Sequence, residues 1–327
     1  MIRPGMRIAI VTPAPRRARS GNRVTALRWA GLLRSLGHQV RVLEDWHGEE
    51  ADLLVAVHAR RSYSSLALWR ERRGPAPLVV ALAGTDLYAD LPSGSREARR
   101  ALELADRLVV LQQRGLAALP EQARGKARAI VQSARPPPGA ERWRPGSPLR
   151  VTVSGHLRAV KDPFLVAEAA RLLPPGSGIV VEHVGGALDP EHERRAREEM
   201  ASNPRWRWLG ELPRRAALLA VARSWLAVIP SRLEGGSNAV SEAVACGVPV
   251  VATRIDGTVG LLGDEYPGYV PPGDACALAA LLGRAEEEPA IRDGLAAACE
   301  RVRPLLAPER EREAWRRLLD ELVRLSG

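Results

Sequence analysis

The stretch from Val228 to Thr253 most constrains what this chain can fold into. It reads as strand, turn, helix, turn, strand, because an apolar run leads into a glycine-rich turn, a helical pattern follows, and a second apolar run begins at Val248. The backbone N–H groups that begin such a helix, with the positive end of the helix dipole behind them, favour an anion such as phosphate. Glu234 and Glu242 flank the turn with seven residues between them. The stretch predicts an anion site in an α/β fold.

Short apolar runs alternate with helical patterns along the rest of the chain, which is typical of a parallel, doubly wound sheet. The strands expected in the first half cover 7–13, 39–43, 52–57, 78–82, 108–111 and 129–132, with a first helix over about 24–36. A proline- and glycine-rich segment follows near Ser133, and the alternation then restarts. The strands expected in the second half cover 150–154, 179–184, 206–209, 226–229, 248–252 and 268–270, and the helices 163–173, 191–201, 214–222 and 277–282.

This order predicts an α/β protein with two doubly wound, Rossmann-like domains that face a central cleft. We expect an N-terminal domain over 1–138, a C-terminal domain over 148–306, and a final helix within 307–327. That helix has an apolar stripe, and we expect it to pack back on the N-terminal domain. Ligands of such sheets bind beyond the carboxyl ends of the strands, so the site is expected at those ends.

The composition narrows the classes of function. The net charge of +10 comes almost entirely from arginine, since Lys126 and Lys161 are the only lysines, and it admits an anionic partner. No pattern of interleaved basic and aromatic residues accompanies the charge, so nucleic acid is not expected as a partner. Apolar runs are far shorter than the ~20 residues of a membrane-spanning helix, and no signal peptide is evident, so the cytoplasm is the expected location. The three cysteines are widely spaced, and no metal site is expected.

The run from Pro230 to Thr253 resembles the donor-site signature of the retaining, two-domain (GT-B) nucleotide-sugar glycosyltransferases of the glycogen-synthase-like type. It keeps the pattern Pro-Ser-x-x-Glu-Gly-Gly, then a second glutamate, then Cys-Gly-x-Pro-Val-Val-Ala-Thr. The resemblance implies that Glu242 accepts hydrogen bonds from the ribose. It also implies that a group of residues at the turn faces the sugar and diphosphate: Glu234, Gly235, Gly236, Ser237 and Asn238. A glycoside-hydrolase pair of carboxylates is the alternative for the two glutamates, and we set it aside because a turn and a helix start separate them.

The same resemblance assigns two further donor loops. Lys161 matches the lysine that this family places on the loop after the first strand of the second domain, where it meets the diphosphate. His156 stands where an arginine is usual, which leaves Arg158 as the alternative for the second phosphate contact. The loop beside the nucleobase is expected at Gly210, Glu211 and Leu212.

The whole chain also resembles a narrower family, the selenosugar synthases of selenoneine biosynthesis. The likeness rests on segments such as Thr12-Pro-Ala-Pro, Ser20-Gly-Asn-Arg, Leu82-Ala-Gly-Thr-Asp and Gln132-Ser-Ala. It implies that the selenium of selenophosphate attacks the anomeric carbon of UDP-GlcNAc or UDP-glucose, and that loss of phosphate then gives a 1-selenosugar. No cofactor is implied beyond these two substrates.

The N-terminal domain should then hold the selenophosphate. A selenium anion is already nucleophilic, so it needs orientation and a cationic pocket more than a base. The candidate acceptor residues lie on loops after strands: Gly21, Asn22, Arg23, Arg60, Arg61 and Thr85. His58 and Asp86 are expected in the cleft beside them, as catalytic residues together with Lys161 and Glu234.

The sequence is also compatible with other functions. One is an ordinary glycosyltransferase that acts on a lipid or a small alcohol, and another is a nucleotide-sugar epimerase of similar architecture. A non-enzyme reading is a basic protein that binds nucleic acid or an anionic membrane surface. The preferred sugar, the product anomer and the oligomeric state are not determined by the sequence.

Overall fold

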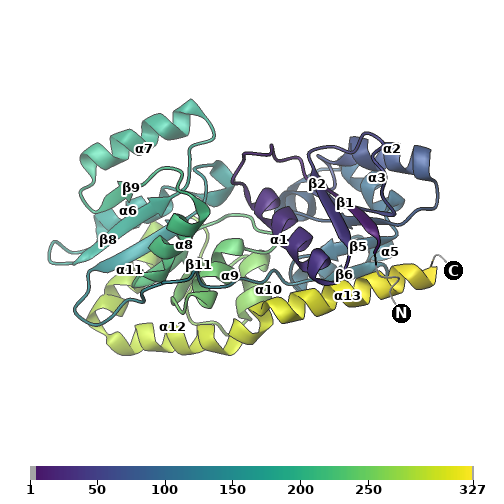
Figure 1. Cartoon of the computed structure of the whole chain (residues 1–327). Helices are drawn as coiled ribbons and strands as arrows, with labels where there is room; N and C mark the ends of the chain where they lie inside the picture. The colour runs from purple at the N-terminus through teal and green to yellow at the C-terminus, as the bar shows by residue number, and fades with distance from the viewer. Residues whose placement is uncertain (1–4, 326–327) are drawn as a thin grey trace. The chain divides into compact units, whose positions relative to one another are not determined.

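The structure is a computed structural model that describes residues 5–325, so the ends of the expected domains at 1–4 and 326–327 lie outside the described residues. The chain divides into two compact units. The first comprises the residues up to Gln132, the short segment 234–236 and the residues from Pro308 onward. The second comprises 133–233 and 237–307. The C-terminal helix therefore belongs with the first unit (Figure 1).

Six parallel strands form the sheet of the first unit, in the order β2-β1-β3-β4-β5-β6. Every residue of the strand Leu53–Val57 is buried, as expected for a parallel strand that is covered on both faces. In the ladder Ile10 lies opposite Val55, which in turn lies opposite Val79. The strands are β1 (Arg7–Val11), β2 (Gln39–Leu43), β3 (Leu53–Val57), β4 (Leu78–Ala81), β5 (Arg107–Val110) and β6 (Ala127–Ala129).

Separate apolar cores lie on the two faces of this sheet. One contains the indole rings of Trp29 and Trp315, whose centroids lie 4.8 Å apart. The other contains Trp46 and Trp69, 5.0 Å apart. The helices of the unit are α1 (Gly21–Ser35), α2 (Tyr63–Arg73), α3 (Arg96–Leu104), α4 (Arg114–Ala117), α5 (Glu121–Arg124) and α13 (Pro308–Leu325), with a π-helical turn η1 (Asp86–Asp90).

Helix α13, drawn in yellow in Figure 1, buries the stripe that its sequence predicts. Trp315 packs against Trp29 of α1, and Nε1 of Trp29 donates to Oε1 of the buried Glu311 at 2.7 Å. Leu318 and Leu322 complete the buried face. The helix is thus part of the core of the first unit.

Helix α1 begins three residues earlier than expected, so the prediction of a loop at Gly21, Asn22 and Arg23 is wrong. Ser20 acts as the N-cap, because its side chain accepts a hydrogen bond from the backbone N–H of Arg23 at 3.5 Å. The three residues form the first turn of the helix. Their place at the helix N-terminus keeps them near the carboxyl end of β1.

The second unit contains six more parallel strands, in the order β12-β11-β10-β7-β8-β9. All six residues of β7 pair in register with β8, from Leu149 opposite Ile179 to Ser154 opposite Val184. The strands are β7 (Leu149–Ser154), β8 (Ile179–Val184), β9 (Trp206–Trp208), β10 (Leu226–Ile229), β11 (Val250–Thr253) and β12 (Tyr269–Val270). The predicted pair of parallel, doubly wound sheets is confirmed.

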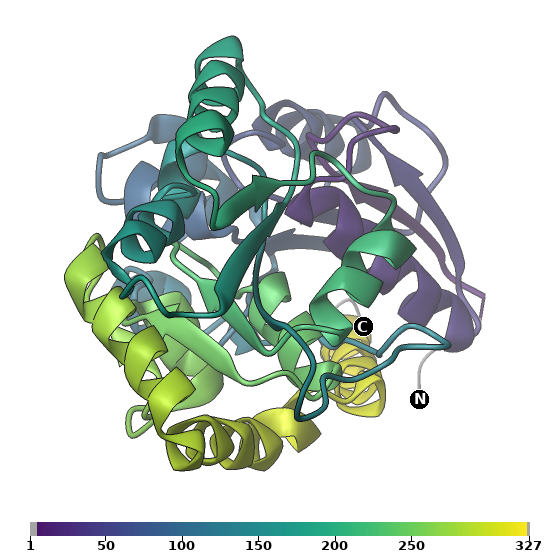
Figure 2. The same cartoon turned by 90° about the vertical axis from the view of Figure 1, so that its left-hand side faces the viewer.

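Helices surround this second sheet, and the consecutive helices α11 and α12 contact each other at one flank of the unit (Figures 1 and 2). The sequence did not single out α12 or α10. The helices are α6 (Leu165–Leu172), α7 (Pro190–Ser202), α8 (Arg214–Ala222), α9 (Asn238–Ala245), α10 (Asp256–Leu262), α11 (Ala275–Glu287) and α12 (Pro289–Val302), with short 3₁₀ turns η2 (Ala159–Lys161) and η3 (Arg303–Leu306).

Some strands begin or end a few residues away from the positions predicted from the sequence. The expected strand over 129–132 is found at Ala127–Ala129, because β6 pairs with β5 and that partner ends at Val110. The segment 130–148 then contains no helix or strand. Within residues 5–325, no helix is both long and apolar enough to cross a lipid bilayer.

Candidate functional site

The carboxyl ends of β1, β3 and β4 bring together the expected acceptor residues of the first unit. These strands are neighbours in the sheet, so the segments that follow them lie along one edge. The first turn of α1 follows β1, His58 follows β3 directly, and Thr85 follows β4. This is where ligands of doubly wound sheets bind.

His58, Asp86 and Thr85 form a hydrogen-bonded chain at this edge. Nδ1 of His58 lies 2.7 Å from Oδ1 of Asp86, and Nε2 of His58 lies 2.9 Å from Oγ1 of Thr85. The short contact to a carboxylate assigns the proton to Nδ1, so Nε2 is left to accept the hydroxyl proton of Thr85. The backbone N–H of Arg61 approaches Nδ1 at 3.4 Å, a distance too long to reverse that assignment.

Backbone groups hold the Asp86 carboxylate in place. It accepts hydrogen bonds from the backbone N–H groups of Ala59, Arg60 and Ala83 at 2.9, 3.1 and 2.8 Å. Together with His58 these donors saturate both oxygens, which offsets the cost of burying this polar side chain completely. Two loops that follow different strands are thereby fastened to one side chain.

His58 has a backbone φ of +80°, which non-glycine residues rarely adopt. The conformation turns the chain after β3, so that the next two N–H groups point at Asp86. Residues held in such conformations concentrate at functional sites, because the surrounding contacts must offset the strain. Here the hydrogen bonds to Asp86 compensate for the backbone strain at His58.

His58 and Asp86, which the sequence suggests as cleft residues, are buried in the structure. Their side chains are 2% and 0% exposed, so neither can meet a substrate directly. Thr85, which is partly exposed, is the member of the chain that reaches the surface. Arg60 is also less available than expected, since its Nε forms an ion pair with Oδ1 of Asp90 at 2.8 Å.

Among residues 5–325, His58, Asp86 and Asp90 are spaced as ligands of a metal ion would be, with donor atoms within 4.8 Å of one another. Their contacts favour a hydrogen-bonded cluster over a metal centre. The lone pairs of Asp86 already face three N–H groups and His58, and Arg60 already places a positive charge against Asp90. A cation held by Asp86 and His58 would have to displace the donors to Asp86.

Arg23 is a buried cation at the same edge. The residue is 7% exposed, and its Nε makes no hydrogen bond with any described residue. Burial of a guanidinium that lacks one of its hydrogen-bond partners is costly, so an anion that accepts from Nε would stabilise this side chain. The N-terminus of α1 adds the positive end of the helix dipole there. By contrast, Arg61 is exposed.

A small hollow of about 10 Å³ lies between α1 and the ends of β3, β4 and β5. Its lining includes Asn22 and Thr25 from α1 and Ala83 from the loop after β4. Nε2 of Gln132 donates to Oγ1 of Thr25 at 2.6 Å, which fixes that hydroxyl. The hollow adjoins the first turn of α1, where Arg23 lies.

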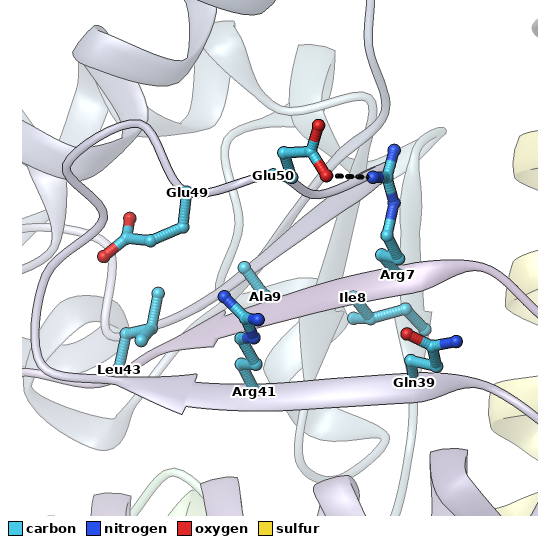
Figure 3. Close-up of a pocket in the computed structure, with 8 residues that line it drawn as sticks. All are labelled: Arg7, Ile8, Ala9, Gln39, Arg41, Leu43, Glu49 and Glu50. Atoms are coloured by element: carbon cyan, nitrogen blue, oxygen red, sulfur yellow. Dashed lines mark hydrogen bonds and ion pairs between the residues drawn. The ribbon is translucent and has the colours of Figure 1, made fainter.

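A larger pocket of about 70 Å³ lies on β1 and β2 of the first unit (Figure 3). Arg7 contacts Glu50 and Asp52 there, at 2.5 and 2.9 Å. Figure 3 shows Arg41 on the neighbouring strand, apart from that pair. The positive charge of Arg7 is thus already neutralised by these two carboxylates. Because the pocket lies along the strands and not beyond their carboxyl ends, we do not assign the function to it.

In the second unit, the loop after β7 carries the predicted phosphate-binding residues. The backbone of Gly185, after β8, approaches it so closely that a Cβ at Gly185 would lie 1.9 Å from the carbonyl oxygen of Gly155. Nε2 of the buried His183 bonds to that same oxygen at 2.9 Å. The stem of Lys161 packs over Gly155, at 3.9 Å from where a Cβ would lie. These contacts fix the base of the loop.

His156 and Arg158 lie on the same loop, on either side of the buried Leu157. Nδ1 of His156 is buried and has no hydrogen-bond partner among the described residues. It lies near Gly186, where an added Cβ would be 3.6 Å away. One ring nitrogen of His156 is thus buried without a hydrogen-bond partner among the described residues.

The loop beside the expected nucleobase follows β9. Gly210 has a φ of +67°, and its carbonyl accepts a hydrogen bond from the N–H of Gly185 at 2.9 Å. Nε1 of Trp208 donates to the carbonyl of Gly185 at 2.7 Å, while Trp206 is buried in the core. Glu211 is exposed and Leu212 is half-buried on this loop. The loops after β8 and β9 are therefore joined by backbone contacts.

The motif that opens with the glycine turn folds as predicted. Ser237 caps α9 by accepting the N–H of Val240 at 3.4 Å, and Asn238 is the first residue of the helix. Glu234 and Glu242 are both 8% exposed. Oε1 of Glu242 forms an ion pair with Arg214 at 2.8 Å.

Sequence reasoning missed Arg214 and His183. Arg214 opens α8 directly after the loop beyond β9, so its place at the carboxyl edge was a usable signal. His183 interrupts the apolar strand β8, and a histidine inside such a run marks a buried polar group. Burial lowers the pKa of His183 to about 4, so its ring is neutral near pH 7.

None of the three cysteines forms a disulfide. Burial, helped by the nearby charge of Glu242, raises the pKa of Cys246 to about 11. Cys299 is also buried, and Cys276 is exposed. Cys246 therefore packs as a small apolar residue within the motif, as its sequence context predicts.

Comparison with solved structures gives the class of the fold. Anabaena Alr3699/HepE, solved in complex with UDP and glucose, superposes with a TM-score of 0.77 at 16% identity, over 97% of this chain and 100% of that chain. Sucrose-phosphate synthase from Thermosynechococcus elongatus gives a TM-score of 0.77 at 17% identity, over 98% of each chain. The predicted α/β fold of two Rossmann-like domains, GT-B, is confirmed.

Comparison of sequences adds a match to a family model and a similar curated protein. Residues 141–301 match the family model for glycosyl transferases group 1. D-inositol 3-phosphate glycosyltransferase of Saccharomonospora viridis is 29% identical to this chain, over 59% of this chain and 49% of its own length. The chain thus spans about half the length of that curated relative. The match supports the resemblance to glycogen-synthase-like glycosyltransferases.

Proposed function

We propose that the protein transfers a sugar from a UDP-sugar to the selenium of selenophosphate, with UDP-GlcNAc or UDP-glucose as donor. The observation that carries this proposal is Arg23, which is buried, lacks a partner at Nε, and lies at the N-terminus of α1. A small, highly charged anion fits such a place better than a neutral alcohol does. The likeness of the chain to selenosugar synthases selects selenophosphate among such anions.

The donor half of the proposal rests on the second unit. The group 1 family match covers this region, and relatives of the same fold have been solved with UDP or UDP-glucose. Glu242 would accept the ribose hydroxyls, Lys161 would meet the diphosphate, and Gly210 would line the base pocket. In the free protein Glu242 binds Arg214, so UDP would have to share or replace that partner.

The departure of UDP develops negative charge on the diphosphate. Removal of one positioned donor to such charge typically costs ~2.7–4 kcal/mol, whereas a helix N-terminus contributes ~0.3–1 kcal/mol. Lys161 should therefore contribute more than the dipole of α9 to this step. Selenium attack needs no base, because the selenium is already ionised and soft.

A second candidate is transfer to a phosphorylated alcohol. The match to D-inositol 3-phosphate glycosyltransferase favours it, and Arg23 would suit the phosphate of such an acceptor as well. Here a hydroxyl must lose a proton as it attacks, so a base would be required. The two candidates differ in the atom that attacks the sugar.

The test offers the purified protein each UDP-sugar with three acceptors in parallel: selenophosphate, thiophosphate and D-inositol 3-phosphate. UDP release and the mass of the sugar product are measured in each reaction. We expect UDP and a selenium-containing sugar with selenophosphate. UDP release with the inositol phosphate alone would support the second candidate and overturn the first.

A further inference from the structure

Thr85, His58 and Asp86 form an assembled nucleophile, base and carboxylate that the sugar-transfer step does not need. Oγ1 of Thr85 lies 2.9 Å from Nε2 of His58, and Nδ1 of His58 lies 2.7 Å from Asp86. A hydroxyl within hydrogen-bond reach of a base, whose other nitrogen is held by a buried carboxylate, is the arrangement that activates serine and threonine nucleophiles. The selenium anion requires no such base.

The proposed reaction contains a second step that does require activation. After transfer, the selenium joins the sugar to the phosphoryl group, and the phosphorus–selenium bond must break to give the free selenosugar. We propose that Thr85 is the nucleophile that removes this phosphoryl group, with His58 as its base and Asp86 as the residue that positions His58. This inference rests on the proposed function.

The geometry gives each residue one role. His58 is 2% exposed, so it can reach the substrate only through Thr85, which is partly exposed. Asp86 accepts hydrogen bonds from three backbone N–H groups as well as from His58, so its position is fixed. The φ of +80° at His58 shows that the chain keeps this ring in place despite backbone strain.

Arg23 provides the charge that the phosphoryl group needs at the same edge. It follows β1, which pairs with β3, and β3 pairs with β4, so the three groups follow adjacent strands. A cation beside a transferring phosphoryl group stabilises the charge that its oxygens carry.

The phosphoryl group is removed by two successive displacements at phosphorus. The proton of Oγ1 moves to Nε2 of His58, Oγ1 forms a bond to phosphorus, and the phosphorus–selenium bond breaks with its electron pair on selenium. Water then attacks the phosphorus of the phosphothreonine, the Oγ1–phosphorus bond breaks, and Oγ1 regains the proton from His58. One water is consumed and one dihydrogen phosphate is released, without oxidation or reduction.

The test uses the full chain with UDP-sugar and selenophosphate, and it follows two products separately. UDP reports the transfer step, and inorganic phosphate reports cleavage of the phosphorus–selenium bond. Thr85→Val keeps the shape of the side chain and removes the hydroxyl, while Thr85→Ser restores a hydroxyl. His58→Asn removes the ring and keeps a residue that tolerates a positive φ.

We expect Thr85→Val and His58→Asn to lower the ratio of phosphate released to UDP released by about 100-fold or more. The Se-phosphorylated sugar should accumulate and be visible by phosphorus NMR. Thr85→Ser should restore phosphate release, which a merely structural role of the hydroxyl would not require.

Two results would overturn the inference in different ways. Phosphate release from Thr85→Val at the wild-type rate would overturn the role of Thr85 and leave the sugar-transfer proposal standing. Absence of selenophosphate-dependent UDP release from the wild-type protein would overturn the proposed function, and this inference with it. Thermal unfolding of each variant shows whether a loss of activity is a loss of folding.

Discussion

The imidazole of His58 donates from Nδ1 to the carboxylate of Asp86 across 2.7 Å, and the backbone N–H groups of two loops converge on the same carboxylate. The pair lies 28 residues apart in sequence but follows neighbouring strands. It fastens the loop after β3 to the loop after β4. The carboxyl edge of the first unit is therefore built as one hydrogen-bonded piece.

Replacing Asp86 by asparagine should destabilise the first unit. The amide places an N–H₂ group against N–H donors and leaves at least one of them unsatisfied, which costs on the order of 1–3 kcal/mol per group. Glu50→Gln is the matched control, because Glu50 is exposed and its ion pair with Arg7 is worth at most about 1 kcal/mol. Urea unfolding should separate the two variants, and equal midpoints would contradict this account of Asp86.

Replacing Arg23 by methionine should stabilise the free protein and weaken acceptor binding. Removal of a largely buried guanidinium whose Nε has no hydrogen-bond partner should raise the free energy of unfolding by on the order of 1 kcal/mol. The same change should raise the KM for selenophosphate strongly. Arg41→Met is the control, since Arg41 is exposed within β2 and should alter neither quantity much. A destabilised Arg23→Met with unchanged KM would show that Arg23 has a structural partner instead.

UDP should stabilise the protein against heat, by about 2.7 kcal/mol at a concentration 100 times its Kd. Lys161→Ala and Glu242→Gln should each reduce the shift in Tm caused by UDP. The only other lysine gives the control: Lys126 donates to the backbone carbonyl of Ala105 in the first unit, so Lys126→Ala should leave the UDP-induced shift unchanged. An equal loss of the shift in both lysine variants would rule out a specific role for Lys161.

His183 should make the second unit less stable as the pH falls. Burial lowers its pKa to about 4, whereas the unfolded chain has the ordinary value near 6.5, so the unfolded state binds the extra proton between these two pH values. Stability should be unaffected above about pH 6.5 and should fall by roughly 3 kcal/mol as the pH drops to about 4. His183→Gln should flatten this dependence. A variant with the wild-type pH profile would contradict the assignment.

The thiols should react with an aromatic disulfide reagent in two groups. Cys276 is exposed and should react quickly in the folded protein. Burial raises the pKa of Cys246 to about 11 and also raises that of Cys299, so neither should form a reactive thiolate near pH 7. Both should react only on unfolding. Prompt labelling of all three would contradict the burial of Cys246 and Cys299, and Cys276→Ser should abolish the fast phase.

Local sequence was sufficient for much of the fold. The strand Leu226–Ile229 and the helix Arg214–Ala222 are found at the residues predicted, and the helix Pro308–Leu325 lies within the predicted range 307–327. They were predictable because apolar periodicity and capping residues act over short distances. The start of α1 was missed, because the cap at Ser20 was read as part of a polar loop.

The candidate site, like the fold, could be predicted from the sequence only in part. The donor motif from Pro230 to Thr253 could be identified from sequence, because its glycines, cap and glutamates lie within one continuous stretch. The ion pair of Glu242 with Arg214 could not, since the partner lies on another helix. The burial of His58 was also missed, because burial depends on what the rest of the unit packs around a residue.

The sequence by itself determined the two parallel sheets, the anion-binding turn and the high arginine content, because these follow from periodicity, local conformation and composition. Only the tertiary structure decided which of those polar residues act together. Parallel strands bring their carboxyl ends to one edge whatever the separation along the chain, and so Thr85, His58 and Asp86 meet there. Packing also decided that Arg23 has no partner at Nε while Arg60 has one in Asp90.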